Sequence, residues 1–299
     1  MAKDVDPGDV KILEWDEEFK TVITRKKILA WIVKLTIPRF RDVDVDTIAA
    51  GIRSDGERHV KMENTVMRER GGSTSILDSV FEMDIEVDGQ IIPILVGIEH
   101  QNDPEPGYSL EVRVQYYAAK MLGRQRHKDY HGLRQSFSVW LLPDPLAHDR
   151  GKVDFLTMGK CTGDEGISPL DDSMVNAVAV HLGTEGEDTE NILDFLSVFF
   201  VEGCRAHTRE GFEAFMKRYK LDEDDLTLNE VEELSSLFQD SKVRYTREAK
   251  AESNVNHVFL VVNNGKHTVE EALNMLEIPD NEREHVRSEV LKRLQHRGI

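Results

Sequence analysis

The sequence predicts a mixed α/β fold of the α+β kind, in which a half that combines helices with a small sheet precedes a helical half. Three observations predict it. Two runs of alternating apolar residues flank the pair Asp88-Gly89, which is the strongest short-range signal of a β-hairpin. Apolar residues recur at helical spacing over 14–35 and again over 109–128. From about residue 170 onward, helical patterns dominate.

The elements follow in order along the chain. Residues 14–35 form the first expected helix, and residues 42–52 a short second one, with Asp44 or Asp46 as its N-cap. Residues 53–75 are polar and end in Gly-Gly-Ser-Thr-Ser, so we expect a loop. The remaining elements are the hairpin, a helix at 109–128, strands at 136–142 and 153–158, helices at 189–201, 208–219 and 228–239, and a helical pair at 268–296.

Composition excludes several classes of protein. The chain has 299 residues, 39% of them hydrophobic, which is typical of a globular protein. Its longest apolar stretches, 28–33 and 258–262, are far shorter than the roughly 20 residues of a membrane span. The polar start is unlike a secretory signal, and Cys161 and Cys204 have no metal or redox spacing, so we expect a cytoplasmic protein. Walker, Rossmann and nucleophile-elbow motifs are absent from the sequence, so we expect no nucleotide cofactor.

The net charge of −18 argues against a simple nucleic-acid coat protein, but the charge is uneven. Residues 151–299 contain 17 basic and 30 acidic residues, and 185–240 alone contain 16 acidic and five basic residues. By contrast, residues 20–41 include seven basic residues and no acidic one, and residues 109–134 include six basic and two acidic residues. These basic stretches are either solvated helix faces or a positive surface for DNA. If DNA binds, the total charge predicts weak, strongly salt-sensitive binding helped by a divalent ion.

The predicted hairpin brings two carboxylates together. A two-residue turn at Asp88-Gly89 makes Val87 face Gln90 and, further along, Asp78 face Glu99, with Cβ atoms roughly 5 Å apart. One face of the hairpin is then apolar and packs on the core, and the other is polar. Two negative charges that face each other destabilise a sheet unless a shared proton, a neighbouring basic side chain or a cation compensates them. Paired carboxylates suit Mg²⁺, whereas an exposed polar face is the alternative, which we expect for Glu82, Asp84 and Glu86 near the turn.

Asp78, followed by Glu99-His100-Gln101 and a helix, resembles the PD-(D/E)XK nuclease superfamily. The likeness extends to its branch of recombination-promoting nucleases, or PD-(D/E)XK nuclease family transposases, and runs from about residue 14 to the C-terminus. The segments that carry it are 15–34, 71–78, 98–125, 138–145 and 268–283.

The resemblance implies an αβββαβ core of the restriction-endonuclease type, with Asp78 on the second core strand and Glu99 on the third. It also implies that Asp78, Glu99 and the main-chain carbonyl of His100 ligate the metal, and that Gln101 completes the catalytic set. Many members of the superfamily carry Lys where this chain has Gln101, although the branch commonly has Gln. A Lys can stabilise developing negative charge, whereas Gln can only orient water by hydrogen bonds.

The activity implied by the resemblance is metal-assisted hydrolysis of phosphodiester bonds, by a Mg²⁺-dependent DNA endonuclease linked to recombination or mobile elements; Mn²⁺ is the expected substitute. We expect residues 1–165 to form the nuclease domain and 166–299 an acidic helical region, in a homo-oligomer. Candidate contacts to DNA phosphates are Arg113, Lys120, Arg124, Lys26 and Lys27. For Arg113, a structural ion pair remains the alternative.

Other interpretations stay open at this point. The nuclease fold could be retained with weak or lost cleavage, leaving a module that binds DNA or another protein. A helical interaction protein whose acidic segment 185–240 docks a basic partner is a further hypothesis. The pair 268–296 imitates a helix-turn-helix, but its second helix carries mixed charge, which favours an ordinary helical hairpin or a dimer contact. Glu17 or Glu18 could assist catalysis, although solvated first-turn residues are the favoured interpretation.

Overall fold

The computed structural model describes most of the chain, and each structural statement below concerns the residues that it describes. These are residues 17–53, 66–68, 74–76, 79–101, 109–125, 130–161, 167–169, 173–183, 189–264 and 267–296. The fold is mixed α/β around a five-stranded mixed sheet, as the sequence predicts.

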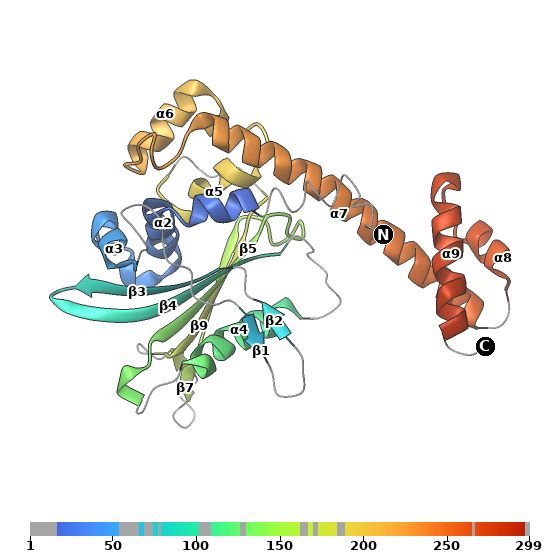
Figure 1. Cartoon of the computed structure of the whole chain (residues 1–299), viewed down its shortest axis with the longest axis horizontal. Helices are drawn as coiled ribbons and strands as arrows, with labels where there is room; N and C mark the ends of the chain where they lie inside the picture. Colours follow the sequence, from blue (N-terminus) through green and yellow to red (C-terminus); the bar gives the residue numbers. More distant parts are fainter. Residues whose placement is uncertain are drawn as a thin grey trace, which may run out of the picture. The chain divides into compact units, whose positions relative to one another are not determined.

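The sheet has the strand order β3-β4-β5-β9-β6 (Figure 1). Strand β4 pairs antiparallel with β3, whereas β4, β5 and β9 run parallel to one another, and β6 closes the sheet antiparallel to β9. The carboxyl ends of three parallel strands therefore meet at one edge of the sheet. The bounds are Ser79–Val87 for β3, Gln90–His100 for β4, Gln135–Leu142 for β5, Lys152–Thr157 for β6 and Val175–His181 for β9.

The β3–β4 hairpin has the predicted register. Its turn residues Asp88 and Gly89 have φ angles of 49° and 76°, the positive values that a two-residue hairpin turn of type I′ requires. Every described pair follows the predicted register, from Val87 with Gln90 to Ser79 with Ile98. The apolar face is buried throughout, as predicted; its members are Phe81, Met83, Ile85, Ile92, Ile94, Val96 and Ile98.

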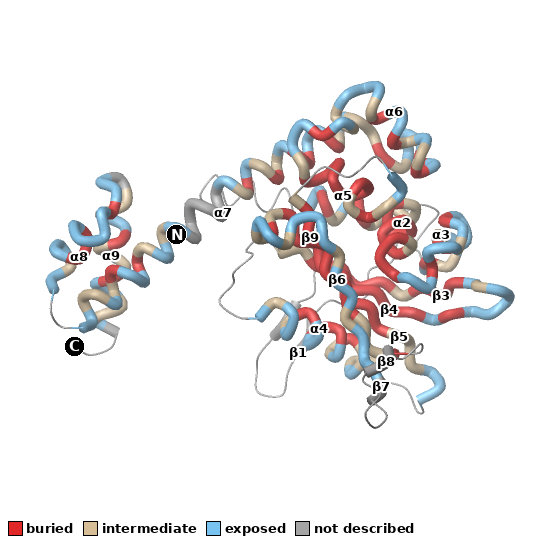
Figure 2. Tube along the Cα trace, turned by 180° about the vertical axis from the view of Figure 1, so that it is seen from behind, coloured by how far each residue is buried: buried red, intermediate tan, exposed pale blue. Residues whose placement is uncertain are grey.

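Helices cover this apolar face of the sheet (Figures 1 and 2). Residues 17–23 are helical, and α2 (Lys26–Thr36), α3 (Val45–Gly51), α5 (Ile192–Phe200) and α6 (Arg209–Arg218) contribute to one core with the strands. Of the two predicted caps, Asp44 is the one that caps α3, and its side chain accepts the Asp46 N–H. Short 3₁₀ turns lie at η1 (Pro38–Phe40), η2 (Tyr130–Gly132) and η3 (Arg205–His207).

The expected single helix over 14–35 is wrong at one point. The chain leaves the helical conformation at Thr24–Arg25, where Arg25 is extended with φ −74° and ψ 131°. From there the Arg25 guanidinium donates to both carboxylate oxygens of Glu230, at 2.5 and 3.1 Å, and to the Asp225 carbonyl at 2.9 Å. A tertiary ion pair therefore accompanies the break, and a local periodicity cannot anticipate it.

The opposite face of the sheet is covered by α4 (Leu110–Arg124), which the Ser109 hydroxyl caps. The helix can lie close to β4 because residue 97 is a glycine: a Cβ there would stand 2.7 Å from the Met121 sulfur. Trp140 and Tyr117 pack edge to face in this second core, with ring centroids 5.4 Å apart. The helix expected over 109–128 ends at Arg124 in the structure, where Gln125 is its extended C-cap.

Strand β9 corrects the expectation that the chain is helical from residue 170. Its residues Ala177 to His181 are all buried, since β5 and β6 flank it and the two cores cover its faces. A strand covered on both faces has a continuous apolar run rather than an alternating one, so it lacks the usual strand pattern. Two further ladders join β1 (Val66–Arg68) with β2 (Thr74–Ile76), in the expected loop, and β7 (Gly159–Cys161) with β8 (Ile167–Pro169).

The chain divides into two compact units, Met1–Gln239 and Asp240–Ile299. The division falls within α7 (Leu228–Asn263), later than the expected boundary after residue 165, because β9, α5 and α6 share the core of the sheet. The second unit has its own apolar core, to which α7, α8 (Val269–Met275) and α9 (Asp280–His296) contribute.

Arginines of α9 form ion pairs with acidic residues of the same unit. Arg287 pairs with Glu270 at 2.6 Å and also with Glu284, and Arg293 pairs with Glu252 at 2.6 Å. These pairs agree with the interpretation of 268–296 as an ordinary helical hairpin.

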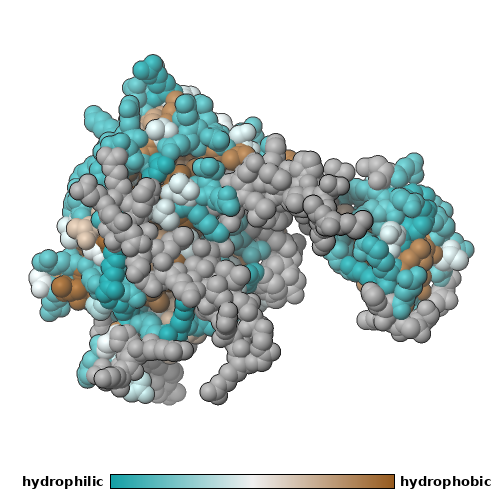
Figure 3. All heavy atoms as spheres, viewed as in Figure 1, coloured by the Kyte–Doolittle hydropathy of each residue, from teal (hydrophilic) through white to brown (hydrophobic). Residues whose placement is uncertain are grey.

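Within the described ranges, every helix is too short or too polar to span a bilayer. The described surface visible in Figure 3 is mainly hydrophilic, with small hydrophobic areas, in keeping with a chain of which 31% of residues are charged.

Candidate active site

The candidate site is built on the end of β4, where the strand carries Glu99, His100 and Gln101. Glu99 is register partner to Trp140 of β5, and the Gln101 N–H donates to the Leu141 carbonyl at 2.9 Å. Because side chains alternate along a strand, Glu99 and Gln101 belong to the face covered by α4. Glu99 is only 4% exposed, which is unusual for a glutamate and costs free energy unless a partner compensates its charge.

Arg113 of α4 connects the helix to this strand end. Its guanidinium donates to the Gln101 side-chain oxygen at 3.1 Å. The guanidinium carbon lies 5.2 Å from the centre of the Trp140 ring and 5.5 Å from that of Tyr117. Such contacts orient a guanidinium by cation–π attraction. With its oxygen turned to Arg113, the Gln101 amide directs its NH₂ group away from Arg113.

The predicted partner of Glu99, Asp78, lies outside the described residues. The last described pair, Ser79 with Ile98, is the ladder step next to the predicted Asp78–Glu99 pair. In the described part of the chain, groups of three or more His, Cys, Asp or Glu side chains suited to a metal ion are absent. The described oxygen donors of the predicted metal site are therefore the Glu99 carboxylate and the His100 carbonyl.

Two carboxylates nearer the turn have a different role from the one expected. Arg53 pairs with Glu82 at 2.6 Å and with Asp84 at 3.2 Å, and Arg134 pairs with Asp84 at 2.7 Å. Arg134 also donates to the Met83 carbonyl at 2.9 Å. Burial raises the pKa of Asp84, but the hydrogen bonds and charges of Arg134 and Arg53 outweigh it and hold the pKa below its usual value. Glu82 and Asp84 are thus counter-ions of two arginines, whereas Glu86 is exposed, as expected.

The candidate phosphate contacts fall on two different faces. Lys120 and Arg124 lie on α4, the helix that covers Glu99, and Lys120 is 4.8 Å from the Tyr116 ring centre. Lys26 and Lys27 lie on α2, which packs on the opposite face of the sheet. Lys27 also pairs with Asp225 at 3.4 Å. The structure therefore brings Arg113 to Gln101 but does not bring Lys26 and Lys27 to the candidate site.

The basic stretch 20–41 is partly neutralised by the acidic segment 185–240. The hydrogen bond from Arg25, with smaller contributions from Thr227, lowers the pKa of Glu230 to about 2, which marks a strong ion pair. Glu17 and Glu18 are exposed, in agreement with the interpretation as solvated first-turn residues.

The same edge of the sheet holds a pair that sequence reasoning missed. His181, the last residue of β9, lies with its Nε2 3.0 Å from an Asp154 carboxylate oxygen on β6. The two residues are 27 positions apart in the chain and belong to no motif. This pair could have been found only by recognising β9 as a strand, because its antiparallel pairing with β6 brings Asp154 near His181.

Comparison of the chain with models of protein families, with characterised proteins and with solved structures found no match in any of the three.

Proposed function

We propose that this protein is a metal-dependent DNA endonuclease that hydrolyses phosphodiester bonds and acts in recombination or on mobile elements. The observation that carries the proposal is the β3–β4 register. All nine predicted pairs that the structure describes are present, and one further step of the same ladder would pair Asp78 with the buried Glu99. That pair is the arrangement expected of a PD-(D/E)XK nuclease.

The topology supports the finer fold assignment. A hairpin, the helix α4 and a strand β5 parallel to β4 follow the ββαβ order that ends the expected αβββαβ core. The expected core has one more strand, outside β3. There the described residues supply an antiparallel bridge between Ile52 and Met83, and the Arg53 N–H donates to the Glu82 carbonyl at 3.3 Å.

The donor chemistry at the strand end fits Mg²⁺. This ion prefers oxygen ligands and usually takes one or two carboxylates, leaving its other positions to water and substrate phosphate. Glu99 and the His100 carbonyl, with Asp78 as the second carboxylate, would hold it. When bound, the ion polarises the scissile phosphate and lowers the pKa of a bound water.

The remaining task of the chain is to position water and substrate. Gln101 would orient the attacking water with its NH₂ group, because Arg113 holds the amide oxygen. Arg113 in turn is held over Trp140 and Tyr117, so the amide is oriented before substrate arrives. Lys120 and Arg124 on the same helix are the phosphate contacts that we retain. Lys26 and Lys27 are set aside because they lie on the helix of the opposite face.

The test is cleavage of supercoiled plasmid DNA in Mg²⁺ by the Glu99→Gln variant, with Glu86→Gln as a matched control. Both substitutions remove one charge from the same face of the hairpin, but Glu86 is exposed beside the turn. We expect Glu99→Gln to lose about 100-fold or more in rate, since even the loss of a residue that supports a ligand costs ~10–100-fold. Glu86→Gln should cleave normally. Equal rates in the two variants would remove Glu99 from the active site.

A second candidate function, a nuclease fold that binds DNA or protein without cutting, is favoured by one observation. The Gln101 oxygen already accepts from Arg113, and a glutamine cannot supply the positive charge that a lysine brings to this position. DNA binding that persists in EDTA, together with no cleavage in Mg²⁺ or Mn²⁺, would establish this alternative.

A further inference from the structure

The two edges of the five-stranded sheet differ in how they are covered. At the β3 edge, Ile52 forms an antiparallel bridge with Met83, and most residues of the strand are buried. At the other edge, β6 has β9 as its one strand partner within the ranges that the structure describes, and four of its six residues are exposed (Figure 2). An open strand edge presents N–H and C=O groups with which a further strand can pair. The β6 edge is therefore available for strand addition.

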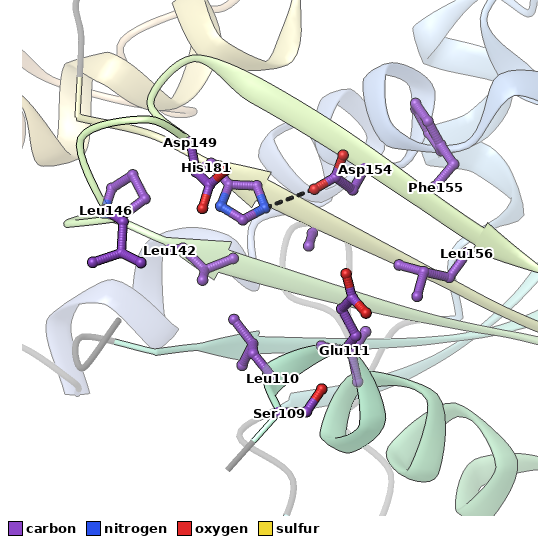
Figure 4. A pocket seen from close by; sticks show the side chains of 13 residues that line it. Ser109, Leu110, Glu111, Leu142, Leu146, Asp149, Asp154, Phe155, Leu156 and His181 are labelled. Atoms are coloured by element: carbon purple, nitrogen blue, oxygen red, sulfur yellow. Dashed lines mark hydrogen bonds and ion pairs between the residues drawn. The ribbon is translucent and has the colours of Figure 1, made fainter. Parts of the chain in front are cut away.

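β6 presents apolar side chains on one of its two sides. Phe155 is 46% exposed, and it points to the opposite side of the strand from Leu156 (Figure 4). Val153 shares the side of Phe155, because side chains alternate along a strand, and it packs against the core that the sheet shares with α2 and α5. Natural edge strands avoid pairing by means of charges, prolines or bulges, whereas an exposed phenylalanine favours association. The side of β6 that carries Phe155 therefore favours burial by a partner.

Two opposite charges lie on the other side of β6. The Lys152 side chain is 52% exposed and pairs with Asp149 at 3.0 Å, and that of Asp154 is 60% exposed and lies 3.0 Å from His181. Each charged group keeps capacity for a second partner, since an ammonium has three donors and a carboxylate about four acceptor sites. Because the two charges cancel, the strand is locally neutral although the whole chain has a net charge of −18. The strand itself therefore does not repel a second copy.

The charges select one register for pairing β6 with the β6 of a second copy. In a two-fold symmetric antiparallel pair of identical strands, one residue faces its own copy at the centre. Centring the pair on Lys152 or Asp154 makes two like charges face each other, which destabilises a sheet. Centring it on Phe155 makes each Asp154 face Leu156, where its charge has no partner across the strands. Centring it on Val153 makes each Lys152 face Asp154 of the other copy, so that two ion pairs form.

We propose that β6 is the interface of a two-fold symmetric homodimer, in which the β6 strands of two copies pair antiparallel around Val153. The two five-stranded sheets then join into one sheet of ten strands. Phe155 of each copy lies diagonally across from Val153 of the other, within reach of a large side chain, so the exposed ring becomes covered. The charges that protect this edge against other strands are thus the ones that recognise its own copy. The proposal does not depend on the nuclease activity.

Sedimentation of the full chain over a range of concentrations tests the dimer, with Phe155→Glu as the variant. The matched control is Ile91→Glu, since Ile91 is 68% exposed on β4, which lies three strands from β6. We expect reversible, micromolar dimerisation of the wild type, at least about tenfold weaker dimerisation of Phe155→Glu, and no change in Ile91→Glu. A wild-type chain that stays monomeric at about 100 µM would overturn the proposal and leave the edge to a strand of another protein. A dimer that Phe155→Glu does not weaken would place the interface elsewhere.

Two charge variants test whether the strand recognises its own copy in the proposed register. Lys152→Glu makes each pair at the interface acid against acid, and Asp154→Lys makes each pair base against base, so we expect each variant alone to dimerise at least about tenfold more weakly than the wild type. In a mixture of the two variants, both pairs across the strands again join opposite charges. The mixture should therefore form a heterodimer with nearly wild-type affinity. A mixture that dimerises no better than its components would contradict the pairing of Lys152 with Asp154.

Disulfide trapping locates the centre of the pair. In a Cys161→Ser background, Val153→Cys places two thiols directly opposite each other, at a Cα separation of roughly 4.5–5.5 Å that a disulfide can bridge. Phe155→Cys is the matched control, because the two introduced cysteines would stand four residues out of register with each other. We expect oxidation to give a covalent dimer of Val153→Cys at least about tenfold faster than of Phe155→Cys. Faster trapping of Phe155→Cys would centre the pair on Phe155, and equal trapping would mean random collision; either result would overturn the proposed register.

Discussion

The two ends of the polar face of the β3–β4 hairpin use acidic residues in opposite ways. Near the turn, Glu82 and Asp84 are paired with Arg53 and Arg134. At the other end, Glu99 is 4% exposed, and the arginine of α4, Arg113, donates to Gln101. Acidic residues of one strand face can therefore be structural counter-ions at one end and candidate metal ligands at the other. What separates them is burial: the Asp84 side chain is 34% exposed, whereas Glu99 is 4% exposed.

The largest effect that would sharpen this comparison is on stability at the turn end. Arg134→Met should destabilise the protein by about 2–3 kcal/mol, because it leaves the Met83 carbonyl without this donor and the partly buried Asp84 carboxylate with Arg53 alone. The arginine side chain is only 14% exposed and reaches both Asp84 and the Met83 carbonyl. Urea unfolding measures the change. Cleavage per folded molecule should stay the same.

The matched control for that substitution is Arg209→Met. Arg209 also pairs with an acid, Glu213 at 3.4 Å, but its side chain is 88% exposed. An exposed pair of this kind contributes about 0–1 kcal/mol. A similar loss of stability in both variants would mean that Arg134 is no more than a surface charge.

A smaller effect is expected at the Glu99 end, on rate rather than stability. Arg113→Met preserves much of the packing against Trp140 and Tyr117 but removes the donor to Gln101. We expect plasmid cleavage to slow about tenfold, equivalent to ~1.4 kcal/mol, because the amide is no longer oriented. Single-turnover kinetics at saturating DNA separates this from weaker binding. A change in DNA affinity with an unchanged rate would make Arg113 a phosphate contact instead.

The smallest expected effect is the pH dependence of stability from Asp84. Its pKa is lower in the folded state than in the unfolded chain, so its stabilisation is fully present above the unfolded pKa, near 4, and is lost as pH falls through the folded value. After discounting for solvent screening, we expect about 1 kcal/mol. The difference in unfolding free energy between wild type and Asp84→Asn should therefore be constant above about pH 5 and shrink toward pH 3. A difference that is independent of pH would contradict the ion pairs.

The sequence predicted the parts of this fold that depend on local signals. Asp88-Gly89 and the alternation around it set the hairpin register, and that register leads to Glu99 and Gln101. The sequence likewise limited the cap of α3 to Asp44 or Asp46, and the structure shows that Asp44 is the cap.

Contacts between distant segments were not predictable in the same way. Arg134 and Asp84 are 50 residues apart, and Arg25 and Glu230 are 205 apart, so no periodicity connects them. Strand β9 was missed because a strand buried on both faces has no alternation, and the His181–Asp154 pair was missed with it. Ion pairs between distant residues and strands buried on both faces were therefore the features that the sequence did not predict.

The most direct test of the central claim is the position of a bound divalent ion. Crystals soaked in Mn²⁺ should show anomalous density within about 2.0–2.4 Å of a Glu99 carboxylate oxygen, with the Asp78 carboxylate and the His100 carbonyl completing the protein ligands. The density should vanish in Glu99→Gln crystals and persist in Glu86→Gln crystals. Density elsewhere on the hairpin, or density that survives Glu99→Gln unchanged, would contradict a nuclease site at the end of β4.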